Sequence, residues 1–573
     1  EGADPTACKG QAPAQPVECT CTTLCTEGAS NPDCPVCSAE GAHLATVCKG
    51  AASMPLAPRA THYHAICGAA CNGHTDGGRH SESEWTPWDG QAPLTAKGYY
   101  YLTKDAVSYV EVPDNTTIYL CLNGHTLELP EGQSIRLGKE FSAFYLCDCQ
   151  SETVTTYGNI GSDGLWKKSP TPGNCDLAGG VITGGKNHGV IAKSPLDAKN
   201  TVTFNMYGGN IAGNTADRGG GVYGFTCTLF ICGGSIIGNT AQENGGGVSN
   251  TNGEILISDT ASIARNRAGD AGGGVHIFSG TLEIGKDCSI TGNTANKGGG
   301  LYTHGSDFEM SGGSITGNIS ELGGGVYLYH IGARNPGSIT SGSITGNTAT
   351  NGGGMYINPQ SPCSITVSGD SITGNTATNG GGIYVEEGEA FTLNGPGSVT
   401  GNEAENGGGI YVNEGAFNTD ASAAISSNTA NNGGGIYIGC NGSHTIKGSV
   451  NGNTAENGGG GVYAAAPDIV INMEKSGGIT NNQAYGNGGG VYVASGAGLK
   501  IMDAEISGNE VLAGPGGGIY GAGAKYFILE NSEVKNNGAT IGGGGIHLYQ
   551  VTETELKSCT VSDNRTWGAL AAV

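Results

Sequence analysis

The sequence predicts an all-β chain folded as a right-handed parallel β-helix with coils of about 27 residues. A phrase of three glycines followed by an aliphatic residue recurs every 25 to 29 residues, and an Asn track keeps the same spacing. No unit contains the ten or more residues of helical periodicity that an α-helix needs. The chain has 106 Gly and 20 Pro residues, a content that suggests disorder unless the glycines are periodic. They are periodic, so a repeat fold is expected.

Each unit consists of short apolar runs, such as SIT and GIYV, separated by turn residues. Each strand would pair with its equivalent in the next coil, and the crossover rule favours a right-handed path. At about 4.8 Å per coil, the steps from Asn214 to Asn564 give a rod roughly 60 Å long. Leucine-rich repeats lack support because they require a regular Leu framework, and calcium-binding nonapeptides require a carboxylate after their glycines. Phosphate-binding glycine loops require a following helix.

Strand alternation assigns the faces of each coil. In GGIYV, Ile383 and Val385 share the face that fills the bore, and Tyr384 points outward. The outward tyrosines are expected either to stack on one another or to form an aromatic platform for glycan rings or a partner protein. The equivalent outward positions are Tyr223, Tyr302, Tyr327, Tyr356, Tyr384, Tyr411, Tyr437, Tyr463, Tyr492 and Tyr520, with His276 and His547 in two coils. The candidates for the platform are Tyr356, Tyr384, Tyr411, Tyr437, Tyr463 and Tyr492.

The repeated Asn predicts a structural ladder. An amide at one turn of every coil can bond to its own backbone and to the Asn above and below. The glycine triplets suit a turn that needs positive φ or a close backbone approach. The ladder is expected to include Asn347, Asn375, Asn402, Asn428 and Asn453.

The N-terminal part of the sequence has a different composition. Nine cysteines fall in residues 1–71, a density typical of disulfide-bonded secreted modules. The stretch LCLNGHTLEL suggests the opening coil, and Cys121, Cys147 and Cys149 are expected to staple it. The predicted organisation is a Cys-rich module at 1–52, a Cys/His-rich linker module at 53–95, irregular coils with a cap at 96–200, and regular repeats at 201–573.

Four residues of the linker module have spacings that suit a metal. His64, Cys67, Cys71 and His74 could hold zinc tetrahedrally, and a disulfide between Cys67 and Cys71 is the simpler alternative in a secreted chain. Calcium is the other possible metal, because β-helix polysaccharide lyases bind calcium through clustered Asp residues. No cofactor is required by the repeats.

The formal charge of -24 disfavours nucleic-acid partners, because such proteins neutralise phosphates with basic residues. No apolar run is long enough for a membrane-spanning helix. The chain starts EGADPTACKG and ends TWGALAAV; we expect a mature or trimmed chain, tethered through sequence beyond residue 573.

The phrase ITGNTAxNGGGxY resembles the repeats of the chlamydial polymorphic outer membrane proteins, and more broadly the β-helix adhesins of gut Gram-positive bacteria. The resemblance covers residues 200–573. It implies a right-handed β-helix of the pectin-lyase-like type and, for the best-known members, adhesion. Ile usually stands where the chlamydial repeat has Phe, and autotransport is not implied.

These observations predict an extracellular protein of the bacterial cell surface that acts as an adhesin or structural stalk. It would bind host or neighbouring-cell glycans or proteins by its lateral face or its N-terminal module. We expect no enzyme activity. The alternative is a polysaccharide lyase or glycoside hydrolase, which needs clustered carboxylates on adjacent coils. Carboxylates such as Glu386 and Glu403 are instead scattered near loops.

Overall fold

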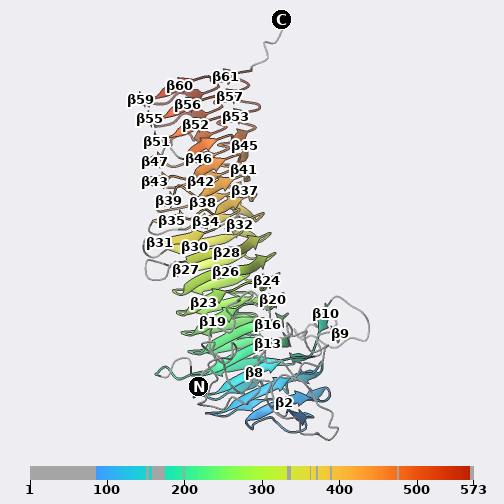
Figure 1. The fold of residues 1–573 in the computed structure, drawn as a ribbon. Helices are drawn as coiled ribbons and strands as arrows, with labels where there is room; N and C mark the ends of the chain where they lie inside the picture. Colours follow the sequence, from blue (N-terminus) through green and yellow to red (C-terminus); the bar gives the residue numbers. More distant parts are fainter. Residues whose placement is uncertain are drawn as a thin grey trace, which may run out of the picture.

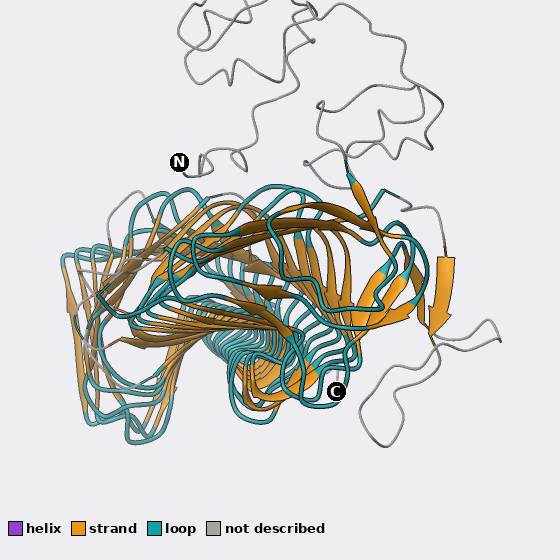
Figure 2. Cartoon of the chain, turned by 90° about the horizontal axis from the view of Figure 1, so that it is seen from below, coloured by secondary structure: helices purple, strands orange, loops and turns teal. Residues whose placement is uncertain are grey.

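The computed structural model describes residues 85–149, 154–157, 175–197, 201–331, 337–359, 361, 363–368, 372–386, 390–473 and 477–567. The predicted fold class is confirmed: the chain is a right-handed parallel β-helix whose coils stack into a rod (Figure 1). Seen along the axis, successive coils superpose (Figure 2). The described part contains strands and turns but no helix, so none of its elements is a helix that could span a membrane.

One coil shows how the repeat folds. β31 (Cys363–Val367) and β32 (Ile372–Thr373) lie in a first sheet, β33 (Thr376–Asn379) in a third sheet, and β34 (Ile383–Val385) in a second sheet. Each strand pairs in parallel with its equivalent one coil away; Tyr384, for example, pairs with Tyr356 and Tyr411. Equivalent residues therefore form columns along the rod, which makes every repeated side chain a neighbour of its own kind.

The first sheet has 31 strands within the described residues and takes two strands from most coils. Besides β31 and β32, its strands are β1 (Thr86–Trp88), β2 (Gly98–Leu102), β3 (Ala106–Val107), β5 (Thr117–Cys121), β6 (Thr126–Glu128), β8 (Ala143–Cys147), β11 (Val181–Thr183), β13 (Thr203–Ala212), β16 (Thr228–Ile237), β19 (Glu254–Ile257), β20 (Ser262–Ala264), β23 (Thr281–Ile284), β24 (Ser289–Thr291), β26 (Asp307–Thr316), β28 (Gly337–Thr345), β35 (Phe391–Asn394), β36 (Ser398–Thr400), β39 (Phe417–Thr419), β40 (Ala424–Ser426), β43 (Gly442–Ile446), β44 (Ser449–Asn451), β47 (Ile469–Met473), β48 (Gly478–Thr480), β51 (Gly498–Met502), β52 (Glu505–Ser507), β55 (Tyr526–Glu530), β56 (Glu533–Lys535), β59 (Glu553–Lys557) and β60 (Thr560–Ser562).

From β15 onward, the strands of the second sheet follow the glycine triplets. With β34, its strands are β4 (Glu111–Val112), β7 (Ile135–Leu137), β12 (Val190–Lys193), β15 (Val222–Phe225), β18 (Val248–Thr251), β22 (Val275–Phe278), β25 (Leu301–His304), β27 (Val326–Ile331), β30 (Met355–Pro359), β38 (Ile410–Val412), β42 (Ile436–Ile438), β46 (Val462–Ala464), β50 (Val491–Val493), β54 (Ile519–Ala522) and β58 (Ile546–Tyr549).

The third sheet precedes the glycine triplets and is interrupted. Its first part is β14 (Thr215–Arg218), β17 (Thr240–Asn244) and β21 (Arg267–Ala268). With β33, its second part is β29 (Thr348–Asn351), β37 (Glu403–Asn406), β41 (Thr429–Asn432), β45 (Thr454–Gly458), β49 (Gln483–Ala484), β53 (Glu510–Val511), β57 (Gly538–Ala539) and β61 (Arg565–Thr566). Isolated parallel bridges through Thr294 and Ile319 join the two parts.

The N-terminal coils extend further than the sequence suggested. β1 already pairs in parallel with β2, and β2 with β5, so paired coils begin before the predicted boundary at residue 96. The antiparallel pair β9 (Val154–Tyr157) and β10 (Cys175–Ala178) projects from the side of the stack (Figure 1). The predicted modules at 1–52 and most of 53–95 lie outside the described residues.

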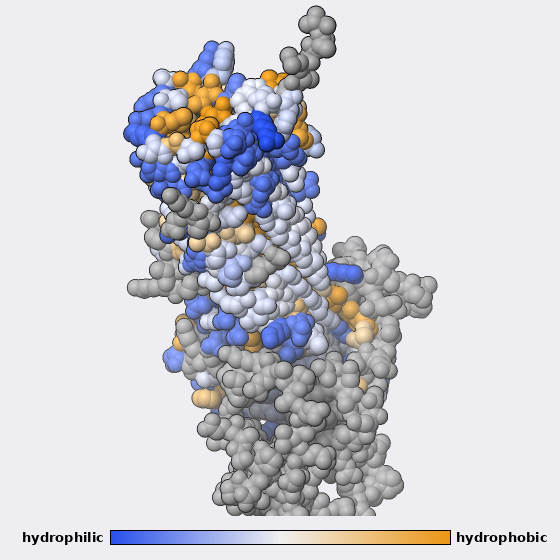
Figure 3. All heavy atoms as spheres, turned by 45° about the horizontal axis from the view of Figure 1, so that its top comes forward, coloured by the Kyte–Doolittle hydropathy of each residue, from blue (hydrophilic) through white to orange (hydrophobic). Residues whose placement is uncertain are grey.

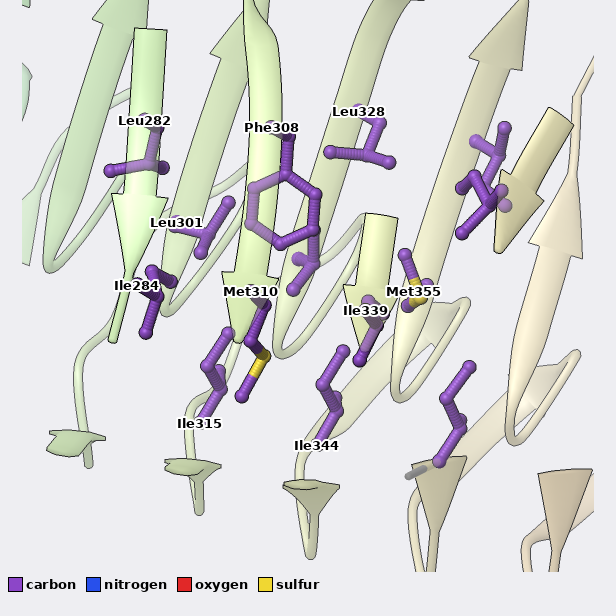
Figure 4. Packing of buried hydrophobic residues seen from close by; sticks show 14 of the residues in the cluster. Leu282, Ile284, Leu301, Phe308, Met310, Ile315, Leu328, Ile339, Ile344 and Met355 are labelled. Atoms are coloured by element: carbon purple, nitrogen blue, oxygen red, sulfur yellow. The ribbon is translucent and has the colours of Figure 1, made fainter. Parts of the chain in front are cut away.

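The core is one continuous apolar column inside the coils. Figure 4 shows Leu282, Phe308, Met310 and Ile344 pointing into the bore from successive coils, and all four side chains are at most 2% exposed. The inward assignment of Ile383 and Val385 agrees with their burial. Since every coil contributes to the same column, burial of apolar area stabilises each coil mainly through its two neighbours.

The glycine triplet serves both predicted purposes. Gly380 has φ of 65°, in the left-handed region that favours glycine. A Cβ on Gly381 would lie 2.5 Å from the carbonyl oxygen of Glu403, and one on Gly382 would lie 2.7 Å from that of Gly409. The first glycine therefore permits the turn, and the other two permit backbone to pass close to backbone.

Apolar side chains reach solvent at the C-terminal end of the described coils. Leu556 and Val561 are each 49% exposed and Trp567 is 50% exposed. Orange residues gather at this end in Figure 3, whereas the visible side of the regular coils is pale to blue.

Candidate functional site

The repeated Asn side chains form a ladder through the buried turn. The Oδ1 of Asn402 accepts hydrogen bonds from the backbone N–H and the Nδ2 of Asn375, both at 3.0 Å. The Nδ2 of Asn402 donates to Oδ1 of Asn428 at 3.0 Å and to the carbonyl of Ile372 at 3.1 Å. Asn347, Asn375, Asn428 and Asn453 make the same set of bonds. The hydrogen-bonding capacity of each buried amide is thus fully satisfied within the protein, so this ladder is structural.

A second Asn ladder runs along the third sheet, and the sequence reasoning missed it. Nδ2 of Asn379 donates to Oδ1 of Asn351 at 2.9 Å, and the pattern continues through Asn406 and Asn432. These residues precede the glycine triplets, and they are only half-buried. The sequence signal that could have predicted this second ladder is the Asn that directly precedes the glycine triplet in these coils.

The outward tyrosines of the second sheet meet edge to face from Tyr302 to Tyr356 and stack face to face after that. We call Tyr223, Ser249, His276 and their in-register equivalents up to His547 the tyrosine column. From Tyr356 to His547 the ring centroids are 4.7 to 5.6 Å apart, and most neighbouring rings lie within 11° of parallel. The faces of these rings are covered by neighbours in the column, so a ligand can reach only their edges and hydroxyls.

The expected exposure is wrong for Tyr356 and Tyr384, which are 4% and 6% exposed. The reason lies in a second column of side chains on the same face. We call it the outer column; it consists of the residues that lie two positions after each member of the tyrosine column. Near Tyr356 the outer column holds Tyr329 and Glu386, and the Tyr356 hydroxyl donates to the Glu386 carboxylate. Burial, then this hydrogen bond, raises the Tyr356 pKa well above its usual range.

The other platform candidates remain partly open. Tyr411, Tyr437, Tyr463 and Tyr492 are half-buried. Beside Tyr411 the outer column holds Asn413, whose Nδ2 donates to Glu386. Beside the other three it carries only small residues, namely Gly439, Ala465 and Ala494, and these small neighbours leave one side of each of the three rings in solvent. Burial still raises the pKa of Tyr463 to about 12, so its hydroxyl stays protonated near neutral pH and can donate or accept hydrogen bonds.

Further aromatic groups escaped the sequence reasoning because they lie outside the regular phrase. Tyr99, Tyr119 and Tyr145 stack along the first sheet at 4.2 and 4.4 Å. On the second sheet, the outer column holds Phe278, His304 and Tyr329 in consecutive coils; their neighbouring rings are 4.4 and 4.8 Å apart.

This outer-column group is not charged at neutral pH. Burial lowers the pKa of His304, and the nearby His330 imidazole lowers it further. Burial also lowers the pKa of His330. Phe278 is 37% exposed, so the group forms a neutral aromatic surface on an acidic rod.

The predicted zinc site and the predicted disulfide of the opening coil have different outcomes. His64, Cys67, Cys71 and His74 lie outside the described residues. Cys121 carries a free, buried thiol, so it does not form the predicted disulfide. Its thiol lies beside those of Cys147 and Cys149, and burial raises its pKa.

Cys232, which the sequence reasoning did not single out, is disulfide-bonded. Among the described residues, no group of three or more His, Cys, Asp or Glu side chains could hold a metal ion.

His444 is a polar side chain within the apolar core. His444 is fully buried in the column that also contains Phe417 and Ile471. Its Nδ1 accepts the backbone N–H of Phe417 at 3.2 Å, while its Nε2 has no partner. Burial lowers the pKa of His444 to about 4.

Comparison with protein families agrees with this architecture. Residues 416–572 match the right handed beta helix region, and residues 287–304 match the Chlamydia polymorphic membrane protein repeat. Neither the curated proteins nor the solved structures gave a match. The matched segment DCSITGNTANKGGGLYTH contains the ladder residue Asn293, a glycine triplet and Tyr302. The chain is therefore a right-handed β-helix repeat protein whose repeats resemble those of the chlamydial polymorphic membrane proteins.

Proposed function

We propose that this chain is an extracellular, surface-displayed rod that acts as an adhesin or structural stalk for a bacterial cell. The observation that carries the proposal is the continuous Asn ladder from Asn214 to Asn564, because each repeated phrase along it has a structural use. The resemblance to surface-protein repeats supports the location. The disulfide at Cys232 fits an oxidising compartment.

The lateral face supplies the binding surface in this proposal. Along Tyr411, Tyr437 and Tyr463 the partner meets ring edges and hydroxyls at a repeat of about 4.8 Å. Such a row suits a long partner that lies parallel to the rod, either a glycan chain or an extended protein segment. The N-terminal module is the other candidate, and it lies outside the described residues.

The test uses the intact chain on glycan arrays and on cultured host cells. We compare the wild type with a variant in which Tyr411, Tyr437 and Tyr463 are all replaced by Phe, because Phe preserves the stack and removes only the hydroxyls. Loss of binding in this variant would assign the contact to the lateral row. Wild-type protein that binds neither glycans nor cells would be a passive stalk.

Catalysis is the competing function class. Incubation with pectin and hyaluronan, followed at the ultraviolet absorbance of unsaturated sugars, tests for a lyase, and a reducing-sugar assay tests for a hydrolase. Turnover in either assay would replace the adhesin proposal by an enzyme.

A further inference from the structure

A break in the outer column separates two phenyl rings by one small polar residue. Phe225, Thr251 and Phe278 occupy successive coils, and their strands β15, β18 and β22 pair in register. In-register residues of parallel strands point to the same side of the sheet, and neighbouring strands are about 4.8 Å apart. Thr251 therefore lies between two aromatic side chains whose attachment points are roughly 10 Å apart.

The outer-column positions beyond the two phenyl rings hold His304 and Lys193. Phe278 has its ring contact with His304, at 4.4 Å and 63°. Phe225 pairs on its other side with Lys193, whose ammonium lies 5.0 Å from the Tyr223 ring centroid. Between the two rings the outer column holds only the short side chain of Thr251. All three residues reach solvent, with Phe278 37% exposed and the other two half-buried.

We propose that a neutral sugar ring of a glycan binds over Thr251, between Phe225 and Phe278. The apolar C–H faces of a pyranose would pack against the two phenyl rings, as flat apolar groups pack on aromatic faces. The Thr251 hydroxyl would exchange hydrogen bonds with the sugar hydroxyls, and the amide of Asn252, in the adjoining turn, is the second polar group. The proposal rests on the proposed function and names a ligand class for its lateral face.

Charge favours a neutral ligand over an acidic one. The chain carries a formal charge of -24, which repels uronic-acid, sulfated and sialylated glycans over distances up to the screening length. The adjoining His304 adds no positive charge at neutral pH because burial lowers its pKa, and the ammonium of Lys193, beyond Phe225, lies over the Tyr223 ring. An apolar side chain placed between the rings would leave the Thr251 hydroxyl without a partner, which is costly when the group is desolvated.

The site differs from the regular tyrosine column in a way that matters for sugars. In the column from Tyr384 to Tyr463, each ring face is covered by the next ring at 4.8 to 5.1 Å. A sugar ring is too thick to enter that spacing. Thr251 provides the missing space by replacing one ring with a short side chain.

The experiment uses the full chain on an array of neutral hexose oligosaccharides printed beside sialylated and uronic-acid glycans. The strongest neutral oligosaccharide is then titrated calorimetrically. We expect Phe225→Ala and Phe278→Ala each to weaken binding by roughly tenfold or more, as removal of a central aromatic contact usually does. Thr251→Trp should abolish binding because the indole fills the space while both phenyl rings remain.

A matched control is Tyr549→Ala. Tyr549 is a 58% exposed aromatic of the same outer column, with Ala522 in the coil before it, and its removal should leave the affinity unchanged. All four variants change exposed or half-buried residues, so equal thermal midpoints by circular dichroism will show that the fold is intact.

Three results would overturn the inference. They are no binding of neutral oligosaccharides by the wild type, wild-type affinity in Phe278→Ala and Thr251→Trp, and selection of apolar peptides instead of sugars by the same three residues. If cells still bind the Phe278→Ala protein while no neutral glycan binds the wild type, the proposed surface function is retained and the sugar site at Thr251 is rejected.

Discussion

Replacing one buried ladder residue should destabilise the rod far more than replacing one residue of the half-buried ladder. Asn402→Ala removes the acceptor of two donors, the backbone N–H and the Nδ2 of Asn375. Asn402 is 1% exposed, so water cannot replace the missing oxygen without opening the turn. At about 1 to 3 kcal/mol for each unsatisfied buried donor, the expected loss is roughly 2 to 6 kcal/mol.

The matched control is Asn379→Ala. Its amide donates to Asn351 and accepts from Asn406, but the residue is half-buried and water can reach it. Its replacement should cost less than about 1 kcal/mol.

Hydrogen exchange is the suitable assay, because a repeat array need not unfold in one step and a single unfolding free energy can be undefined. Peptides covering residues 372–386 report the Asn375 amide and its surroundings. A loss of about 2 kcal/mol corresponds to roughly thirtyfold faster exchange. Equal exchange in Asn402→Ala and Asn379→Ala would refute the view that the inner ladder stabilises the coils through buried amides.

Three other perturbations follow from the same structure. Lowering the pH from about 6.5 toward 4 should reduce the free energy of unfolding by up to roughly 3 kcal/mol through His444. The folded pKa of about 4 lies below the unfolded value, so the unfolded chain binds the proton first. His444→Phe should lose less thermal stability in acid than the wild type, and an identical loss in both proteins would contradict this. Tyr437→Ala removes two stacking contacts at 4.8 and 5.0 Å and should lower stability by about 1 to 3 kcal/mol. Tyr437→Phe keeps the ring and should be nearly neutral. Equal shifts of the melting temperature in the two variants would show that the hydroxyl, not the stack, matters. Cys227 is fully buried with its pKa raised to about 12, so iodoacetamide at pH 8 should leave it unmodified in native protein while the partly exposed Cys559 reacts, as read by mass spectrometry.

The period of the sequence was sufficient to predict the coils and the inner ladder. A glycine triplet and an Asn at constant spacing place each coil in register with the next, so the inward position of Ile383 and the amide chain through Asn375 and Asn402 follow from repetition alone. Local rules work here because almost every contact joins equivalent residues of adjacent coils.

The exposure of the tyrosines did not follow from repetition. Tyr384 and Tyr437 occupy identical places in the phrase, yet Tyr384 is 6% exposed and Tyr437 is half-buried. Their difference arises in the outer column, where Glu386 stands near one and Gly439 beside the other. A reading centred on the repeated letters overlooks these variable positions.

The sequence by itself determined the fold class, the direction of the inward side chains and the structural use of the Asn and Gly positions, because a strict period leaves one way to stack the coils. Only the tertiary structure decided which aromatic rings have open faces. That property depends on the outer-column residues, which lie two positions along the strand or in the next coil, about 27 positions distant in the chain, and whose size varies independently of the repeat. It buried Tyr356 and Tyr384, and it placed Phe225 and Phe278 on either side of Thr251 in the outer column.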